Sequence, residues 1–146
     1  MKAKIAINGF GRIGRMVFRK MVSEDSVELV AVNASYPSET LAHLIKYDTN
    51  HGKFDGEVIA EDNALIINGK RVAIVNNRDP KELPWEELGI DIVIEATGKF
   101  NAREKAALHL EAGAKKVILS APGKNEDVTI VMGVNDEMLN IEQHDI

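Results

Sequence analysis

Residues 3–14 read Ala-Lys-Ile-Ala-Ile-Asn-Gly-Phe-Gly-Arg-Ile-Gly, an apolar run that leads directly into the spacing Gly-x-Gly-x-x-Gly. The apolar run predicts a β-strand over residues 4–8, and the periodicity that follows predicts an amphipathic helix from about Arg12. At such a junction Gly9 allows a sharp turn, Gly11 lets another group approach the backbone, and Gly14 lets helix and strand pack closely. The amides that open the helix are unpaired and carry the positive end of its dipole, so they attract phosphate.

A glycine triplet alone is weak evidence, because glycines also gather in turns that bind nothing. Here the triplet directly follows a predicted strand and opens an amphipathic helix, which is the context that the motif requires. The stretch therefore predicts a dinucleotide site with the pyrophosphate at the N-terminus of the helix.

The composition is that of one globular domain. The chain has 146 residues, of which 45% are hydrophobic and 28% charged, values typical of a folded α/β protein. Its net charge of −5 provides no general attraction for nucleic acid or an anionic membrane, so any phosphate affinity must be local. Cysteine is absent, which excludes disulfides, zinc–thiolate sites and thiol nucleophiles within this chain. No leader and no apolar run of membrane-spanning length is evident, so we expect a cytoplasmic location.

Strand and helix patterns alternate along the chain. Apolar runs predict strands at residues 4–8, 27–33, 90–95, 116–120 and 128–131. Helix-start signals predict helices from Arg12, Ser38, Asp79 and Asn101, with Ser38, Asp79 and Asn101 as capping residues. Residues 57–76 read as short antiparallel strands with a hairpin turn at Asn68-Gly69. We therefore predict an α/β fold: a doubly wound, mostly parallel sheet of the Rossmann type with a short antiparallel hairpin insertion, forming one dinucleotide-binding domain over residues 1–146.

The first helix has a predicted inner face and a predicted outer face. The apolar spacing assigns Ile13, Met16, Val17 and Met21 to the inner face. Arg15 and Arg19 are expected to lie on the solvated side.

Five predicted strands are each followed by small, hydroxylated or glycine-rich residues. These loops are residues 9–14, 33–35, 76–78, 96–98 and 120–123. Such residues are ordinary after a single strand, but in an open α/β sheet the ligand lies across the carboxyl ends of the strands. Five such loops at one edge predict a groove for an extended ligand.

Four segments resemble phosphorylating glyceraldehyde-3-phosphate dehydrogenases. They are Ile-Asn-Gly-Phe-Gly-Arg-Ile-Gly-Arg at 7–15, Leu-Ala-His-Leu-Ile-Lys-Tyr-Asp-Thr-Asn-His-Gly at 41–52, Glu-Ala-Thr-Gly-Lys-Phe at 95–100 and Gly-Ala-Lys-Lys-Val-Ile-Leu-Ser-Ala-Pro at 113–122. The resemblance covers the whole chain. It implies a tetramer-forming oxidoreductase that converts an aldehyde phosphate to an acyl phosphate with a nicotinamide cofactor.

The resemblance also assigns cofactor contacts. Arg12 and Ile13 would contact the pyrophosphate, and Arg78 would lie near the adenine end of the cofactor. Residues 33–35 would contact the adenine ribose, and Thr97 and Ser120 would lie along the groove. With the glycine turn included, the candidate cofactor-binding residues are Gly9, Phe10, Gly11, Arg12, Ile13, Gly14, Asn33, Ala34, Ser35, Arg78, Thr97, Gly98 and Ser120.

Ala34 departs from the family pattern. The family's NAD-using members place an aspartate at this position, where it accepts hydrogen bonds from the ribose. A carboxylate would repel a 2′-phosphate, whereas Ala34 followed by Ser35 removes that repulsion and offers a hydroxyl. We therefore expect NADP as the preferred cofactor, with NAD as the second. The alternative is a member that uses NAD without this contact, since no arginine stands beside Ala34 in the sequence.

The absence of the family's catalytic residues is a second departure from the family pattern. In the family, a Ser-Cys-Thr-Thr-Asn segment carries the nucleophile, and this chain contains no cysteine. None of its four histidines, at positions 43, 51, 109 and 144, corresponds to the catalytic histidine. We expect a cofactor domain without its catalytic domain and without dehydrogenase activity of its own. In the family a C-terminal helix covers a groove of this domain, so the domain alone is expected to self-associate.

Two alternative functions remain open, and three further residues are expected to have a structural role only. The cofactor domain of an erythrose-4-phosphate dehydrogenase and a non-catalytic nucleotide- or RNA-binding module are the alternatives, the latter disfavoured by the negative charge. Asp48 and His51 are expected to pack a loop, because two residues without a third ligand make a poor metal site. Trp85 is expected to pack in the core, and no metal site or catalytic residue is predicted.

Overall fold

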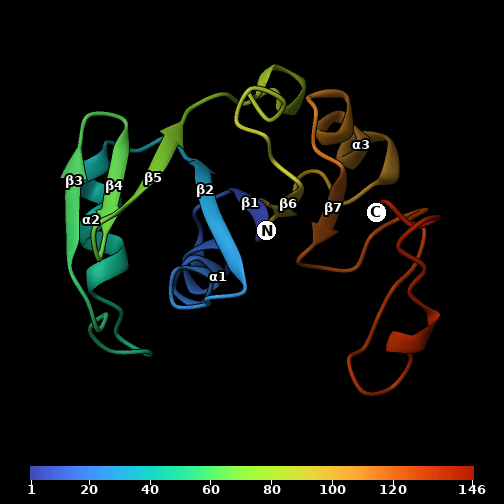
Figure 1. Ribbon diagram of the computed structural model, residues 1–146, viewed down its shortest axis with the longest axis horizontal. Coiled ribbons are helices and arrows are strands. Elements are labelled where there is room, and N and C mark those ends of the chain that lie inside the picture. Colours follow the sequence, from blue (N-terminus) through green and yellow to red (C-terminus); the bar gives the residue numbers. More distant parts are fainter.

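The computed structural model describes residues 1–146 as one seven-stranded sheet with three α-helices (Figure 1). In chain order the elements are β1 (Ala3–Asn8), α1 (Arg12–Val22), β2 (Val27–Asn33), α2 (Ser38–Lys46), β3 (Val58–Glu61), β4 (Ala64–Ile67), β5 (Lys70–Val75), β6 (Ile92–Glu95), α3 (Arg103–Glu111) and β7 (Lys116–Leu119), with short 3-10 helices at Pro80–Glu82 and Asp136–Met138. The predicted Rossmann-type α/β fold is confirmed.

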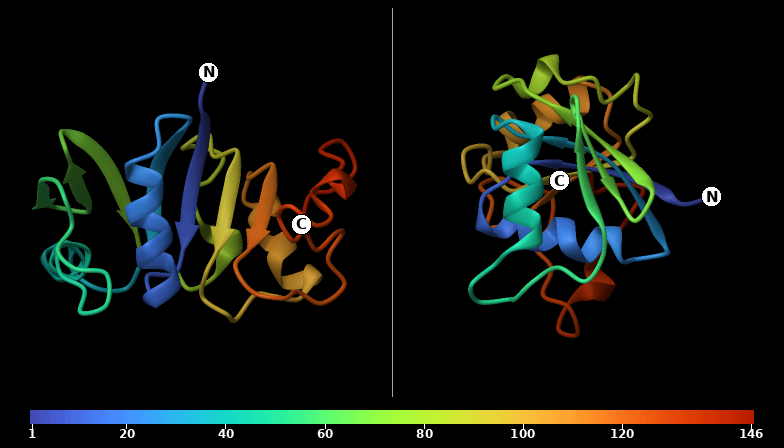
Figure 2. Two further views of the ribbon diagram at one scale, coloured as in Figure 1. Left: turned by 90° about the horizontal axis from the view of Figure 1, so that it is seen from below. Right: turned by 90° about the vertical axis from the view of Figure 1, so that its left-hand side faces the viewer.

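The strand order is β3-β4-β5-β2-β1-β6-β7. The central strand β1 pairs in parallel with β2 on one side and with β6 on the other. From β1 the chain passes to β2 beside it, then to β3 at the edge of the sheet, and back through β4 to β5 beside β2. It then crosses to the other side of β1 and forms β6 and β7. The topological switch point therefore lies between β1 and β6. In the left view of Figure 2 the arrowheads of β1, β6 and β7 all point toward the same edge of the sheet.

The hairpin insertion forms one side of the sheet. β4 pairs antiparallel with both β3 and β5, while β5 joins β2 in parallel. Asn68 and Gly69 have φ values of 50° and 83°, which are the positive angles that a two-residue hairpin turn requires. The predicted hairpin and its turn are confirmed.

Apolar side chains cover both faces of the sheet. On one face Ile5, Ile7 and Val32 pack with Phe18 of α1 and with Leu41 and Ile45 of α2. On the other face a smaller cluster contains Ala6, Ala31, Leu83, Trp85, Ile90, Val93, Ala112 and Ala114. Small alanines on the strands of this second face let the segment before β6 and the end of α3 lie close to the sheet.

Two predicted helix caps are wrong. Pro37 and Ala102 occupy the N-cap positions of α2 and α3, and neither helix has a side-chain cap, so Ser38 and Asn101 do not cap. The start of α3 is set instead by a tertiary contact. There the Lys124 amide donates to the Asn101 carbonyl, and the Arg103 amide donates to the Lys124 carbonyl.

The expected faces of α1 need two corrections. Phe18 is fully buried and Val17 and Met21 pack against the core, but Ile13 is 56% exposed. Ile13 lies in the first turn of the helix, which extends past the core toward the loops. Arg19 is not a solvated residue, because its guanidinium donates to the carbonyls of Ile45 and Gly52.

The strand predicted at residues 128–131 does not form. The segment after β7 is irregular apart from one 3-10 turn, and Val131 is 56% exposed. At the free edge of β7 the Val117 amide donates instead to the Asp145 carbonyl. β-branched residues favour a strand only where a partner strand is present, and here the edge of β7 is used by another segment.

Candidate dinucleotide-binding site

The three glycines of the β1–α1 turn each meet a different steric requirement. Gly9 has φ 106°, and a Cβ there would lie 2.9 Å from the Thr97 Cγ2 atom. A Cβ on Gly14 would lie 2.2 Å from the carbonyl oxygen of Gly9, so helix and turn pack as closely as predicted. A Cβ on Gly11 would meet no atom within 4 Å. The space beside Gly11 is therefore open to a ligand.

The N-terminus of α1 is uncapped and free of negative charge. Gly11 is the N-cap residue, no side chain caps the helix, and the first turn holds no acidic residue. Arg12 and Ile13 are exposed beside it. Phe10 is buried and packs edge-on against Phe18, with ring centroids 5.7 Å apart. The ring of Phe10 thus anchors the turn in the core.

Backbone hydrogen bonds join the carboxyl ends of five strands. The amide of Ala34 donates to Val75, that of Gly9 to Asn33, that of Ala96 to Asn8, and that of Ser120 to Glu95. These bonds continue the order β5, β2, β1, β6, β7 past the ends of the strands. The five loops that the sequence singled out therefore lie along one edge, with the glycine turn at the switch point.

The end of β2 presents little charge. Ala34 is buried and Ser35 is exposed. The side chain of Asn33 is fully occupied: its Nδ2 donates to the Asn8 Oδ1 at 2.7 Å and to the Asn77 carbonyl at 2.7 Å, and its Oδ1 accepts from the Asn77 amide. Asn33 therefore ties the loop after β5 to the end of β2.

Arg78 comes directly after Asn77, the residue that is hydrogen-bonded to Asn33. It is exposed and forms no ion pair. Because Asn77 is bound to Asn33, the backbone of Arg78 is held next to the residue that precedes Ala34. The sequence shows no arginine near Ala34, and the fold brings one into its neighbourhood.

The loop after β6 is held by a carboxylate. The amide and hydroxyl of Thr97 both donate to the Glu95 Oε2, at 2.8 and 2.7 Å, and the Lys99 amide donates to the Thr97 hydroxyl. Gly98 has φ 75°, which completes the turn. Ser120 is exposed beyond β7, and its hydroxyl makes no hydrogen bond within the chain.

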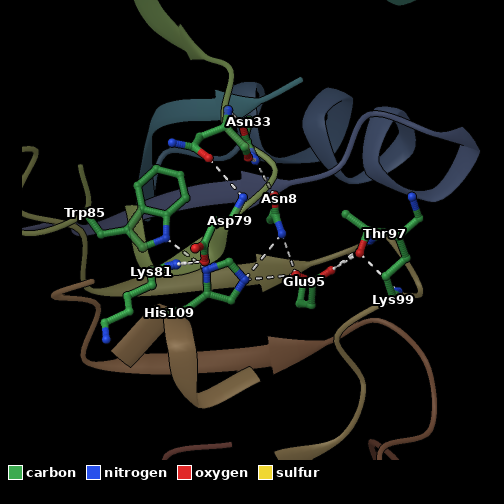
Figure 3. Close-up of polar contacts among 10 residues, drawn as sticks. Asn8, Asn33, Asp79, Lys81, Trp85, Glu95, Thr97, Lys99 and His109 are labelled. Carbon is green, nitrogen blue, oxygen red and sulfur yellow. Dashed lines mark hydrogen bonds and ion pairs between the residues drawn. The ribbon is translucent and has the colours of Figure 1, made fainter. Parts of the chain in front are cut away.

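A buried polar cluster behind these loops escaped the sequence analysis. It contains Asn8, Glu95, His109 and Trp85, from β1, β6, α3 and the segment before β6 (Figure 3). Burial raises the pKa of Glu95, but hydrogen bonds from His109, Thr97 and Asn8 outweigh it and hold that pKa below its ordinary value. A charged residue at the end of the apolar run Ile-Val-Ile-Glu was the one signal available.

Asp48 and His51 pack a loop, as predicted. Asp48 Oδ1 accepts from the amides of Asn50 and His51 and lies 3.0 Å from the His51 Nδ1. The backbone and side chain of His51 lower the pKa of Asp48 to about 2. No cluster of three potential metal ligands occurs in the chain, and none of its helices is both long and apolar enough to cross a bilayer.

One surface hollow, lined by both apolar and charged side chains, lies away from these loops. It is lined by residues from the amino ends of β1, β2 and β5, among them Lys2, Leu29 and Val72. The strands point away from it, so it takes no part in the candidate site.

Comparison with known proteins matches residues 3–103 to the family described as "Glyceraldehyde 3-phosphate dehydrogenase, NAD binding domain". The chain belongs to this family. It is 68% identical over 144 residues to glyceraldehyde-3-phosphate dehydrogenase 2 of Bacillus subtilis, covering 99% of this chain and 42% of that protein. It is 55% identical to glyceraldehyde-3-phosphate dehydrogenase of Geobacillus stearothermophilus and 52% identical to glyceraldehyde-3-phosphate dehydrogenase 1 of B. subtilis, in each case over 146 residues, 100% of this chain and 44% of the relative.

The chain thus spans less than half the length of these relatives. It contains the NAD-binding domain of a glyceraldehyde-3-phosphate dehydrogenase. The family match runs from β1 to the first residue of α3.

Proposed function

We propose that this chain binds a nicotinamide dinucleotide along the carboxyl edge of its sheet, as the cofactor-binding part of a glyceraldehyde-3-phosphate dehydrogenase. The observation that carries the proposal is the glycine turn at the switch point. It combines an uncapped helix N-terminus with open space beside Gly11, which suits an anionic group that needs close contact with backbone amides.

The residues of this edge have separate roles in the proposed site. The amides of Arg12 and Ile13 would bind the pyrophosphate, and Thr97 and Ser120 would line the path of the dinucleotide. When bound, the nicotinamide supplies a hydride acceptor. The chain's own residues bind and orient it.

We propose NADP as the preferred cofactor. Ala34 and Ser35 place no carboxylate at the end of β2, so a 2′-phosphate meets no repulsion there. Arg78 adds a cation, because the bonds between Asn77 and Asn33 hold its backbone near this strand end. The competing proposal is NAD use without a carboxylate contact to the ribose.

The Ala34→Asp variant separates these two proposals. Calorimetry should show that the ratio of NADP to NAD affinity falls about tenfold or more, equivalent to ~1.4 kcal/mol, because a carboxylate then faces the 2′-phosphate. Thr40→Asp is the matched control, since it adds the same charge at an exposed position of α2 and should leave the ratio unchanged. An unaltered ratio in Ala34→Asp would refute the assignment of specificity to this position.

We further propose that the longer protein oxidises an aldehyde phosphate to an acyl phosphate. Each relative named above is a glyceraldehyde-3-phosphate dehydrogenase, which favours glyceraldehyde 3-phosphate over erythrose 4-phosphate. The thiolate nucleophile of this chemistry cannot come from residues 1–146, which include no cysteine. The chain alone should therefore show no phosphate-dependent cofactor reduction, and such activity in a pure sample would contradict the proposal.

A further inference from the structure

Trp85, His109 and Glu95 form a buried chain of hydrogen bonds. The indole Nε1 of Trp85 lies 3.0 Å from the His109 Nδ1, and the His109 Nε2 lies 2.9 Å from the Glu95 Oε1. All three side chains have zero exposure. Figure 3 shows the imidazole between the indole and the carboxylate.

The partners of His109 determine its tautomer. An indole N–H can only donate, so the His109 Nδ1 must accept and carries no proton. The proton of the neutral ring is then on Nε2, which donates to Glu95. The contact with Trp85 therefore selects this tautomer of the imidazole.

The Glu95 carboxylate is saturated by donors. Oε1 accepts from His109 and from the Asn8 Nδ2 at 2.6 Å, and Oε2 accepts from the amide and the hydroxyl of Thr97. A buried carboxylate is stable only with such compensation. Four donors converge on it and no acceptor does, so the site requires an ionised acid.

Two branches lead from Glu95 to the candidate groove. The first runs to Thr97, whose Cγ2 and backbone would contact any side chain added at Gly9. The second runs through Asn8 to Asn33 and from there to Asn77. One carboxylate thus fixes the loops after β1, β2, β5 and β6 relative to one another.

We propose that Glu95 is a positioning residue for the dinucleotide, and that His109 and Trp85 orient it from behind. Glu95 does not touch the ligand in this account. It fixes Thr97 against the glycine turn and, through Asn8 and Asn33, the end of β2, so that four loops are set before the ligand arrives. This inference rests on the proposed function, because it assumes that the groove between these loops holds the dinucleotide.

A purely structural cluster would have a different signature. It would change the stability of the fold, while the folded fraction would bind as before. A positioning cluster changes the affinity of the folded protein. It also makes Trp85, which is the one tryptophan of the chain, sensitive to occupancy of a groove that it does not reach.

Glu95→Gln is the decisive variant because it is close to isosteric and cannot satisfy the site. Whichever way the amide is turned, its NH₂ group faces donors, either those of Thr97 or those of Asn8 and His109. Ile45→Val is the matched control: Ile45 is also fully buried, but it belongs to α2 and packs in the core cluster with Phe18, not in the one that contains Trp85.

The test is calorimetric titration of this chain and both variants with NADP and with NAD, at a temperature where circular dichroism shows each to be folded. We expect Glu95→Gln to weaken the better cofactor at least tenfold and Ile45→Val to stay within twofold. The ¹⁵N indole resonance of Trp85 should shift as the unsubstituted chain is saturated. Where Glu95→Gln does not fold, Trp85→Phe takes its place, with an expected loss of affinity of threefold or more.

The outcomes distinguish the two levels of the proposal. Binding by the unsubstituted chain with unchanged affinity in the folded Glu95→Gln variant, or in Trp85→Phe where that replaces it, would overturn the positioning role alone. An indole resonance that does not move at saturation would also overturn it. If the unsubstituted chain binds neither cofactor, the proposed function fails, and the positioning role fails with it.

Discussion

At the scale of single residues, the β1–α1 turn depends on glycines, because a glycine has no Cβ atom. Gly9 needs a positive φ and lies against the loop after β6, whereas Gly11 has an ordinary φ of −76° and open space beside it. The two glycines therefore serve different ends. Gly9 is required by the fold, and Gly11 leaves room for the ligand of the proposed site.

Alanine substitutions should separate these roles. Gly9→Ala forces a Cβ into a left-handed conformation and against Thr97, and should lower the free energy of unfolding by about 1–3 kcal/mol. Gly11→Ala should leave stability within about 0.5 kcal/mol but weaken dinucleotide binding, because its methyl group enters the open space. Urea unfolding and calorimetry measure the two effects. Equal losses of stability in both variants would contradict this division.

Asp48 predicts a dependence of stability on acid. Hydrogen bonds from His51 lower its pKa to about 2, so the folded state holds fewer protons there than the unfolded state, whose value is near 3.8. The stabilisation is complete above about pH 4 and is lost as the pH falls toward 2. Asp48→Asn should therefore flatten the decline of the urea midpoint between pH 4 and 2, while Asp25→Asn, at an exposed residue without such bonds, should not. Parallel declines in both variants would count against the account.

At the scale of elements, Arg19 fastens α1 to α2. Its guanidinium donates to the Ile45 carbonyl near the end of α2 and to Gly52 in the following loop, and it lies 5.8 Å from the centroid of the Phe54 ring. This clamp therefore ties the segment between α2 and β3 to α1.

Arg19→Lys should destabilise the fold by about 1–2 kcal/mol, because a lysine ammonium cannot reproduce the planar, multiply bonded contact. Arg15→Lys, on the same helix and without a hydrogen bond from its side chain, is the control. Hydrogen exchange at residues 47–54 should increase in the first variant only. Similar exchange in both would show that the clamp is not needed.

Local signals in the sequence were enough for some elements and not for others. The Asn68-Gly69 hairpin and β2 follow from turn chemistry and apolar runs that act within a few residues. The strand expected at residues 128–131 fails because β propensity cannot show whether a neighbouring strand exists. Ile13 was misplaced because helical periodicity does not reveal that the first turn extends past the core.

Only part of the candidate site could likewise be predicted from the sequence. The glycine turn and the loops could be located from the sequence because each follows an apolar strand. The cluster around Glu95 could not, because it joins residues that lie 87 and 101 positions apart from Asn8. The buried histidine of α3 gains a meaning only when the indole and the carboxylate are seen on either side of it.

At the scale of the whole molecule, apolar side chains are unevenly distributed. Six of the large hydrophobic residues with more than half of their surface exposed belong to the segment after β7, namely Val131, Met132, Val134, Met138, Leu139 and Ile141. In Figure 1 this segment forms a lobe beside β7 and α3. An exposed apolar group of this kind favours association.

We expect the chain to form dimers or larger species, with light scattering giving a mass that rises with concentration. Met132→Lys together with Val134→Lys should shift the distribution toward the monomer, because two charges then lie within the apolar lobe. Ile59→Lys, at an exposed apolar residue on the hairpin side, is the control. A monomer mass for the unsubstituted chain at all working concentrations would contradict this expectation.

The central claim is that the sheet edge at the switch point between β1 and β6 binds a dinucleotide. The measurement is a calorimetric titration of the chain with NADP and, separately, with NAD. We expect saturable binding of both at one site per chain, with NADP the tighter ligand. Absence of binding by either, in a sample shown to be folded, would contradict the claim that this edge of the sheet is a dinucleotide site.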